Sequence, residues 1–401
     1  MKFETVVVDI GYPLYCTNFI GENTILVGGG GGEGDNGIPN KLTSVVLSEI
    51  NGLNLKIKDE YDVGNNDDSP TAMDANMDVI LLGCNENSKK IEQTKENNHL
   101  RQFTFNSSGE ITFVKTANIY DVEDVNDYIK IIVLSKDSTV AAVASSKLPT
   151  TVKILDIGTL SVRYEVDIRH ELKDMDFSPN GKLFAYITKS SLEIVSPVTG
   201  STIVRKTDFS KDIILSKFKF LRDDIIIIVG SSKESKGLYA LKILLKNGTP
   251  TLLKQKSLSK NVKNIVSMDI SNERDIAVLA TNNNSIILLN LESLFIIYTF
   301  KEIHNFVITD IVISPNSDYI ASVSVANTLH LIKVPKNISK VRISMKEASQ
   351  LFTRVLLLIL FAYLLYVLYQ KNSHGFFKGL ILQGKKAIEP NLTYFTMNSC
   401  E

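Results

Sequence analysis

Tryptophan is absent from this 401-residue chain, and cysteine is scarce. The three thiols, Cys16, Cys84 and Cys400, are scattered, and none belongs to a CxxC pair. This spacing supports neither a zinc knuckle nor a disulfide framework, and it is typical of a reduced compartment such as the cytosol. Cys16 and Cys84 are therefore interpreted as small buried hydrophobic residues.

An excess of charge of either sign is also missing. The chain has 44 basic and 44 acidic residues, which argues against a general nucleic-acid binder. The five histidines are isolated, and none lies at ligand spacing from a cysteine or an acid. Residues 1–16 contain no apolar run long enough for a signal peptide.

Long apolar runs are absent except for one near the C-terminus. Val355–Gln370 reads VLLLILFAYLLYVLYQ and carries no charge. Its helix would span about 24 Å at ~1.5 Å per residue, slightly short of a ~30 Å hydrocarbon core, and Arg354 can snorkel to lengthen it. We predict a transmembrane helix at 351–370. A buried core helix is the alternative, which the fully apolar circumference disfavours.

The basic residues around this span give only a weak positive-inside bias. Because no signal precedes the span, we expect residues 1–335 to stay in the cytosol, 336–350 to form a linker and 371–401 to be lumenal. Asn391-Leu392-Thr393 is a glycosylation sequon on the lumenal side, with chance occurrence as the alternative.

Turns of one form recur along the chain. In Asp176–Tyr186 a strand end, a tight turn and a new apolar strand follow one another. The first turn residues of five such copies are spaced by 43, 43, 50 and 43 residues: Ser135, Ser178, Leu221, Ser271 and Ser314. A period of ~40–45 residues is typical of a four-stranded propeller blade. Two looser copies, at 20–27 and 75–82, are spaced by 55 and 60 residues, which predicts insertions in the first two blades.

The predicted fold is therefore all-β, a seven-bladed β-propeller in residues 1–335. One blade cannot bury both faces of its sheet, whereas stacking around an axis buries them and closure protects the ends. From that architecture we expect Thr5–Val8 to complete the blade that ends at Thr328–Val334. A pair of β-sandwiches is the alternative, but it needs no constant period. The polar stretch Asn85–Asn98 is interpreted as a solvated loop.

Five consecutive glycines begin at Gly28. They follow a predicted strand at Thr24–Val27 and precede another at Leu42–Leu47, so the segment is an insertion between strands of the first blade. It lacks the helix and the Gly-Lys-Ser/Thr of a P-loop. A plain flexible turn does not explain the ending Gly-Ile-Pro-Asn-Lys at 37–41, where proline stiffens the backbone. A shaped loop that binds a cation through its carbonyls, or inserts into a partner, remains.

This loop carries a resemblance to a known family. Gly11-Tyr12-Pro13 and the loop ending Glu33-Gly34-Asp35-Asn36-Gly37-Ile38-Pro39-Asn40-Lys41 resemble the fungal endoplasmic-reticulum exchange factors for the Sar-type small GTPase, which start COPII coat assembly. Further matching stretches lie along the propeller: Asp67–Ala72, Gly83–Ser88, Val140–Ala142, Arg205–Phe209 and Ala326–His330. The single C-terminal span also fits, although the tail after it is short.

The resemblance implies a WD-repeat-like propeller anchored in the endoplasmic-reticulum membrane, with cycling to the cis-Golgi. It implies a potassium ion held by backbone oxygens of Gly30 to Gly37 and no organic cofactor. The asparagine needed for exchange maps onto Asn40. The partner-binding loop maps onto Gly30, Gly31, Gly32, Glu33, Gly34, Asp35, Asn36, Gly37, Ile38, Pro39 and Lys41. Because they precede the core strand of the second blade, a partner face beside the loop is expected at Asp67, Asp68 and Pro70.

An exchange factor performs no covalent chemistry, since it only binds its GTPase more tightly without nucleotide. We expect the loop to wedge against the switch region, with Asn40 holding a displaced backbone segment, because its amide both donates and accepts. Glu33 and Asp35 could instead gather a cation, or they are solvated loop acids.

Two other functions stay open at this point. A membrane-anchored scaffold or regulator of the same GTPase would not need Asn40. A related family member with a degraded loop lacks exchange activity, so the intact loop ending favours an active factor. A propeller enzyme would need convergent acids or a metal cluster at the central channel, and the sequence shows no sign of either.

Overall fold

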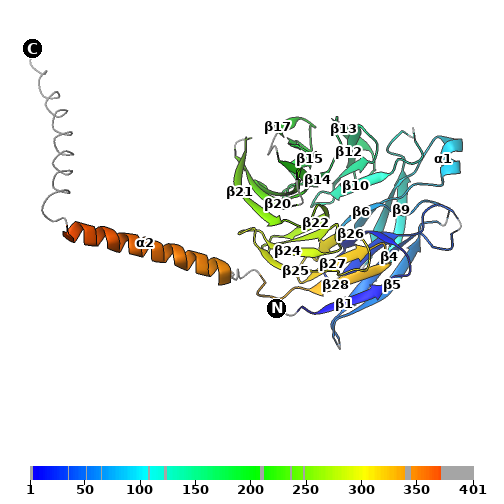
Figure 1. Ribbon diagram of the computed structural model, residues 1–401. Helices are drawn as coiled ribbons and strands as arrows, with labels where there is room; N and C mark the ends of the chain where they lie inside the picture. Colours follow the sequence, from blue (N-terminus) through cyan, green and yellow to red (C-terminus); the bar gives the residue numbers. More distant parts are fainter. Residues whose placement is uncertain are drawn as a thin grey trace, which may run out of the picture. The chain divides into compact units, whose positions relative to one another are not determined.

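Seven four-stranded antiparallel sheets succeed one another along the chain in a computed structural model (Figure 1). It describes residues 3–34, 36–50, 52–64, 66–106, 109–121, 124–207, 212–234, 237–246, 249–338 and 345–371. The chain divides into two units, one up to Val341 and one from Arg342. The first contains all seven sheets, so the predicted all-β, seven-bladed propeller is confirmed.

The first four blades follow the order of the chain, each written from its inner to its outer strand. Blade one contains β2 (Leu14–Phe19), β3 (Thr24–Gly29), β4 (Lys41–Ser48) and β5 (Asn54–Asp62). Blade two contains β6 (Ala72–Asn76), β7 (Val79–Gly83), β8 (Leu100–Phe105) and β9 (Ile111–Ala117). Blade three contains β10 (Ile129–Leu134), β11 (Val140–Ser145), β12 (Thr150–Asp156) and β13 (Val162–Ile168). Blade four contains β14 (Asp174–Phe177), β15 (Phe184–Ile187), β16 (Ser191–Val195) and β17 (Thr202–Thr207).

The last three blades keep this pattern until the ring closes. Blade five contains β18 (Ile213–Arg222), β19 (Ile225–Ser232), β20 (Leu238–Lys246) and β21 (Thr249–Ser259). Blade six contains β22 (Ile265–Ser271), β23 (Ile276–Thr281), β24 (Ile286–Asn290) and β25 (Ile296–Phe300). Blade seven contains β26 (Ile308–Ile313), β27 (Tyr319–Ser324), β28 (Thr328–Lys333) and, from the other end of the chain, β1 (Thr5–Asp9).

The ring closes as the sequence predicts. β1 pairs antiparallel with β28, with Thr5 opposite Ile332 and Asp9 opposite Thr328. Figure 1 shows the first strand of the chain, in blue, beside the orange strands of the last blade. The two ends of the propeller sequence are therefore joined within the four-stranded sheet of blade seven.

The recurring turns join the first and second strands of each blade. In three of them a serine side chain closes the turn: Ser135, Ser178 and Ser314 each accept a hydrogen bond from a backbone N–H five residues later. Asp137, Asn180 and Asn316 accept from the same hydroxyls. This shared geometry explains why a serine followed two residues later by Asp or Asn marks the period.

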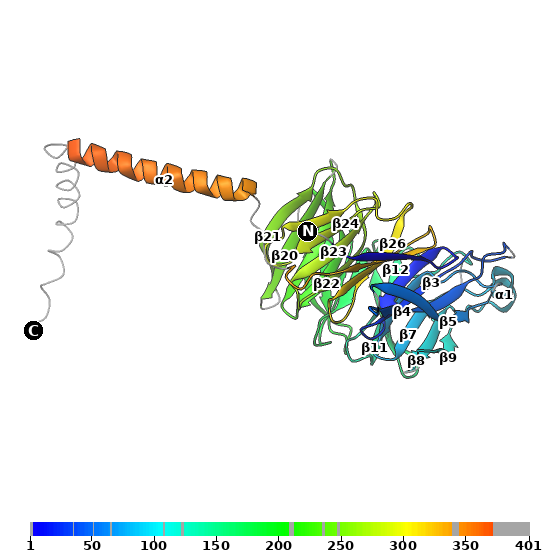
Figure 2. The ribbon, with the colours of Figure 1, turned by 90° about the horizontal axis from the view of Figure 1, so that it is seen from below.

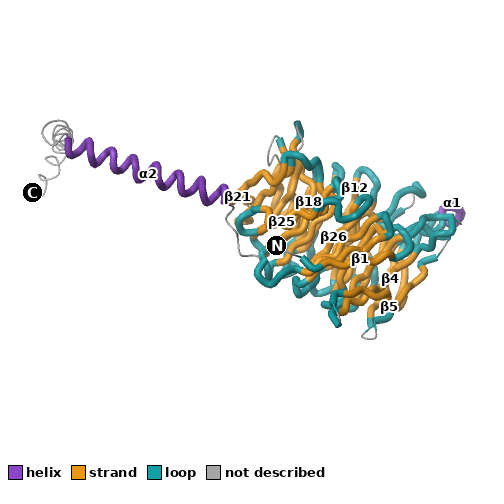
Figure 3. Tube along the Cα trace, turned by 60° about the horizontal axis from the view of Figure 1, so that its bottom comes forward, coloured by secondary structure: helices purple, strands orange, loops and turns teal. Residues whose placement is uncertain are grey.

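The core is divided among the junctions between blades. Each of the seven clusters of buried apolar side chains draws its members from two neighbouring blades. The junction of blades one and two, for example, includes Cys16, Leu26, Ile80 and Phe103. Figure 3 shows the strands as orange layers with loops at their ends. Cys16 and Cys84 are buried and free, as predicted.

The second unit contains one described helix, α2 (Met345–Lys371). Within it, Phe352–Gln370 has a mean hydropathy of 2.1 and is long and apolar enough to cross a membrane. The helix begins at Met345, so the last part of the predicted linker 336–350 is helical. The predicted tail, with Asn391 and Cys400, lies outside the described residues beyond Lys371.

Candidate functional site

The glycine loop connects β3 to β4, so the predicted insertion between two strands of blade one is correct. Gly32, Gly34 and Gly37 have φ angles of 83°, 103° and 77°, a region that favours glycine. At Gly30 a Cβ atom would lie 2.1 Å from the Asn40 Oδ1 atom. The glycines therefore let the backbone turn and approach Asn40 closely.

Asn40 is fully buried and ties the loop to its neighbours. Its Oδ1 atom accepts from the Gly32 N–H at 3.0 Å, and its Nδ2 group donates to the Gly32 carbonyl at 3.0 Å. The same Nδ2 group lies 2.8 Å from the Asp67 carbonyl and 3.4 Å from the Gly64 carbonyl. The amide thus makes both its donor and its acceptor contacts inside the chain, where it holds the loop in shape.

The exposed rim of the loop is ordered by Asn36. Its Nδ2 group donates to the Gly31 carbonyl at 2.8 Å, and its Oδ1 atom accepts from the Ile38 N–H at 2.9 Å. Ile38 is 40% exposed, an apolar side chain presented by a polar loop. Lys41, at the start of β4, pairs with Glu60 at 3.1 Å. Asp35 lies outside the described residues.

The Gly-Tyr-Pro motif and the segment around Asp67 adjoin the loop. The Pro13 carbonyl accepts from the Gly30 N–H at 2.9 Å. A Cβ atom at Gly32 would lie 3.3 Å from the Asp68 Oδ1 atom, and one at Gly28 would lie 3.3 Å from Pro70. The structure therefore brings the glycine loop, Asp67, Asp68 and Pro70 together.

A buried arginine supports this arrangement, and sequence reasoning missed it. Arg101 on β8 donates to the Asp67 Oδ2 atom and to the Val63 carbonyl, both at 2.6 Å. Its side chain is 9% exposed, so the carboxylate of Asp67 neutralises a charge that would be costly to bury alone. Because Asp67 also accepts from Asn40, the ion pair fixes the frame to which the loop is attached.

The interpretation of Asn85–Asn98 as a solvated loop is wrong, because the segment contains the helix α1 (Ser88–Thr94). Asn87 caps it by accepting from the N–H groups of Lys89 and Lys90, and Ile91 is buried beneath it. Asn-Ser before a short stretch with one apolar residue is an N-cap signature that could have been recognised. Figure 2 shows α1 at the rim of the propeller near β3 and β5.

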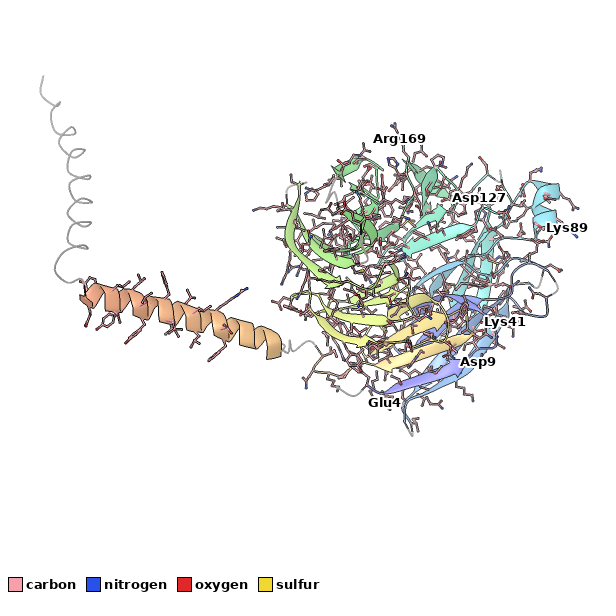
Figure 4. All side chains as sticks on the ribbon, in the orientation of Figure 1. Glu4, Asp9, Lys41, Lys89, Asp127 and Arg169 are labelled. Carbon is pink, nitrogen blue, oxygen red and sulfur yellow. The ribbon has the colours of Figure 1, made fainter. Side chains whose placement is uncertain are left out.

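Glu33 faces this helix. Its carboxylate accepts from the Asn87 Nδ2 group at 2.9 Å and from the Ser88 N–H and hydroxyl at 3.1 and 2.7 Å. Both oxygens of Glu33 are therefore used within the chain. In Figure 4, Lys41 at the end of the loop and Lys89 on α1 lie on the same side of the propeller.

Acidic side chains also converge at the central channel of the propeller, where the sequence showed no sign of convergent acids. A cavity of about 770 Å³ is lined by the carboxylates of Asp74, Asp174, Asp176, Asp269 and Asp310 together with lysines. Each carboxylate accepts from a backbone N–H of the next blade along the ring, such as Leu134 for Asp74 at 2.7 Å. The described residues contain no group of His, Cys, Asp and Glu that could hold a metal ion. These acids therefore link blades.

The fold matches known propellers. The chain superimposes on the WD40 β-propeller domain of Doa1 with a TM-score of 0.57, covering 83% of this chain and 97% of that one, at 9% identity. At this identity the match shows the fold alone. No family model matches the sequence. By fold, the chain is a WD40-type propeller with a candidate membrane anchor.

Full-length sequence similarity is more specific. The chain is 42% identical over 376 residues to the guanine nucleotide-exchange factor SEC12 of Candida glabrata, covering 93% of this chain and 82% of that protein. It is 39% and 32% identical to the SED4 proteins of Candida glabrata and Saccharomyces cerevisiae, but spans only 32% and 37% of their lengths. The chain belongs to the SEC12 family of guanine nucleotide-exchange factors.

Proposed function

We propose that this protein is a guanine nucleotide-exchange factor for a Sar-type small GTPase at the endoplasmic-reticulum membrane, where it starts COPII coat assembly and transport to the Golgi. The family and the candidate membrane helix support the proposal. We also propose that the propeller lies in the cytosol and the C-terminus in the lumen. In this role the chain changes binding equilibria and makes or breaks no covalent bond.

The observation that carries the proposal is the internally braced glycine loop. Asn40 and Asn36 hold its backbone from inside, and Ile38 is presented at its surface. A pre-ordered loop loses little further entropy when it meets a partner, so binding energy remains to displace the nucleotide. We place Ile38 and Pro39 against the switch region of the GTPase.

The proposed role of Asn40 differs from the sequence-based hypothesis. Its amide bonds to Gly32, Gly64 and Asp67, so holding a segment of the partner would require exchanging some of these bonds. We therefore assign Asn40 the role of positioning the loop. The exchange defect expected from its loss is the same in both cases.

We also retain a potassium ion at the loop as a proposal. Backbone carbonyls are ligands suited to hard monovalent cations, and the glycines of the loop add no side chain of their own beside these carbonyls. The carbonyls of Gly31 and Gly32 each accept from an asparagine amide, which leaves a second lone pair on each oxygen. The bound ion would supply positive charge that holds these carbonyls together.

The Asn40→Ala variant tests the proposal. Release of a fluorescent GDP analogue from a Sar-type GTPase is measured with the full-length chain in liposomes. We expect the exchange rate to fall at least about tenfold, because truncation leaves buried backbone groups unpaired and releases the loop.

A matched control is Asn180→Ala, which removes two hydrogen bonds from the turn between β14 and β15. It should leave the exchange rate unchanged. A membrane-anchored scaffold without activity is the alternative, and it predicts no release by the parent protein. Full activity of the Asn40 variant would remove this residue from the mechanism.

A further inference from the structure

The contact between Glu33 and the start of α1 joins two insertions from different blades. Glu33 lies in the loop of blade one, and Asn87 and Ser88 lie in the insertion of blade two. Three hydrogen bonds of 2.7–3.1 Å connect them. Glycine-rich backbone loses more conformational freedom on ordering than any other, so such a contact has a large effect on the shape of the loop.

The α1 side of the contact is itself fixed. The Asn87 Nδ2 group also donates to the Asn66 carbonyl at 2.8 Å, and the Asn87 N–H donates to the Asp67 Oδ1 atom at 3.2 Å. Asp67 is in turn paired with the buried Arg101. The loop is therefore held at adjacent residues, Gly32 by Asn40 and Glu33 by α1.

We propose that the insertion of blade two is a latch that keeps the glycine loop in its exchange-competent shape. Asn87 and Ser88 are positioning residues that act through Glu33, and Arg101 anchors them through Asp67. The positioning role rests on the proposed exchange activity. Opening the latch lowers the fraction of competent loops, which weakens apparent affinity for the GTPase and leaves the rate of the assembled complex unchanged.

The Asn87→Asp variant opens the latch without removing the helix cap. Its Oδ1 atom still accepts from Lys89 and Lys90, while an oxygen replaces the donor that faces Glu33 and the Asn66 carbonyl. We expect the apparent KM for the GTPase to rise about tenfold and kcat to stay within about twofold. The control is Glu92→Gln on the exposed surface of α1, which should change neither value.

A second substitution separates a latch from a direct contact of Glu33 with the partner. In the double variant N87D/E33Q, the new amide can donate to the new carboxylate and still accept from the Ser88 N–H. The latch predicts that the double variant recovers much of the affinity lost in N87D. If Glu33 contacts the GTPase directly, the affinity losses of the single variants N87D and E33Q add in the double variant, and the proposal is overturned.

Hydrogen exchange of the full-length chain in detergent gives a readout that needs no GTPase. Backbone amides of 30–34 should exchange several-fold faster in N87D than in the parent or in Glu92→Gln. Unchanged protection there would refute the latch. Faster exchange of these amides together with no nucleotide release by the parent would instead refute the exchange activity, and with it the positioning role.

Discussion

Asparagine side chains do most of the bonding around the glycine loop. Asn36, Asn40 and Asn87 each donate and accept, which suits them to a backbone that lacks side chains of its own. The sequence pattern identified Asn40, since it closes a rare motif. It could not show that the amide bonds inward, because Gly64 and Asp67 approach Asn40 only through the pairing of β4 with β5.

Histidine burial predicts a pH dependence of stability. Burial, with a smaller contribution from His330, lowers the pKa of His304 to about 4 from an ordinary 6.5. Its Nδ1 and Nε2 atoms lie 2.7 and 2.8 Å from the hydroxyls of Thr328 and Ser322, which suits a neutral ring. The pKa of His304 is lower in the folded state than in the unfolded state, so protonation at low pH favours unfolding. The stabilisation from neutral His304 is therefore fully present above about pH 6.5, and about 3 kcal/mol of unfolding free energy is lost toward pH 4.

The His304→Gln variant isolates this contribution. Denaturant unfolding of both full-length proteins in detergent is measured from about pH 4.5 to about pH 7.5. It gives the difference in unfolding free energy between parent and variant. We expect that difference to be largest at neutral pH and to shrink as the pH falls. Burial raises the pKa of Asp74 to about 6, which acts in the opposite direction, but Asp74 is present in both proteins and cancels. A difference that does not vary with pH would contradict the assignment.

At the scale of elements, the sequence is most informative where the same local structure repeats. The period of the turns predicts the blades because each serine turn uses the same hydrogen bonds. The wider spacing of the first two blades predicts insertions, but not that the second folds into α1. A helix of seven residues is too short to show an amphipathic period, and its stability comes from buried Ile91 and the Asn87 cap.

If the glycine loop binds potassium, the rate of nucleotide exchange should depend on which monovalent cation is present. Replacing potassium by tetramethylammonium at equal ionic strength should slow exchange several-fold, since backbone carbonyls coordinate a small monovalent cation and not a large organic one. The measurement is GDP release by the full-length chain in both salts. Spontaneous release by the GTPase alone serves as the control for effects on the partner. Equal rates in the two salts would contradict the proposal that the loop binds potassium.

At the largest scale, the propeller unit is a closed ring of similar junctions between blades. Neighbouring blades share apolar clusters, and the inner carboxylates add hydrogen bonds from one blade to the next. The closure is an expectation from the propeller architecture, in which the first strand of the chain completes the last blade. The convergence of the carboxylates could not be predicted, since each comes from a different repeat and they meet only when the ring is complete.

Because β1 pairs with β28 on one side only, a proline should destabilise the protein much more at one position of β1 than at the next. The Glu4 carbonyl accepts from the Lys333 N–H, and the Ile10 N–H donates to the Asn327 carbonyl. Since backbone groups alternate along a strand, the Val8 N–H points toward β28 and the Val7 N–H points away from it. Val8→Pro should remove a ladder bond and lower the unfolding free energy by about 2–3 kcal/mol. Val7→Pro, on the outer edge, should cost less than about 1 kcal/mol.

Denaturant midpoints of the two full-length variants in detergent test this prediction. Because the two substitutions are chemically identical and adjacent, they differ chiefly in which edge loses its donor. Val7 is 52% exposed and Val8 packs against the cluster at the junction of blades seven and one, so lost side-chain packing acts in the same direction as the lost bond. Equal midpoints would mean that the pairing of β1 with β28 contributes little, and that the inner carboxylates and apolar clusters alone hold the ring closed.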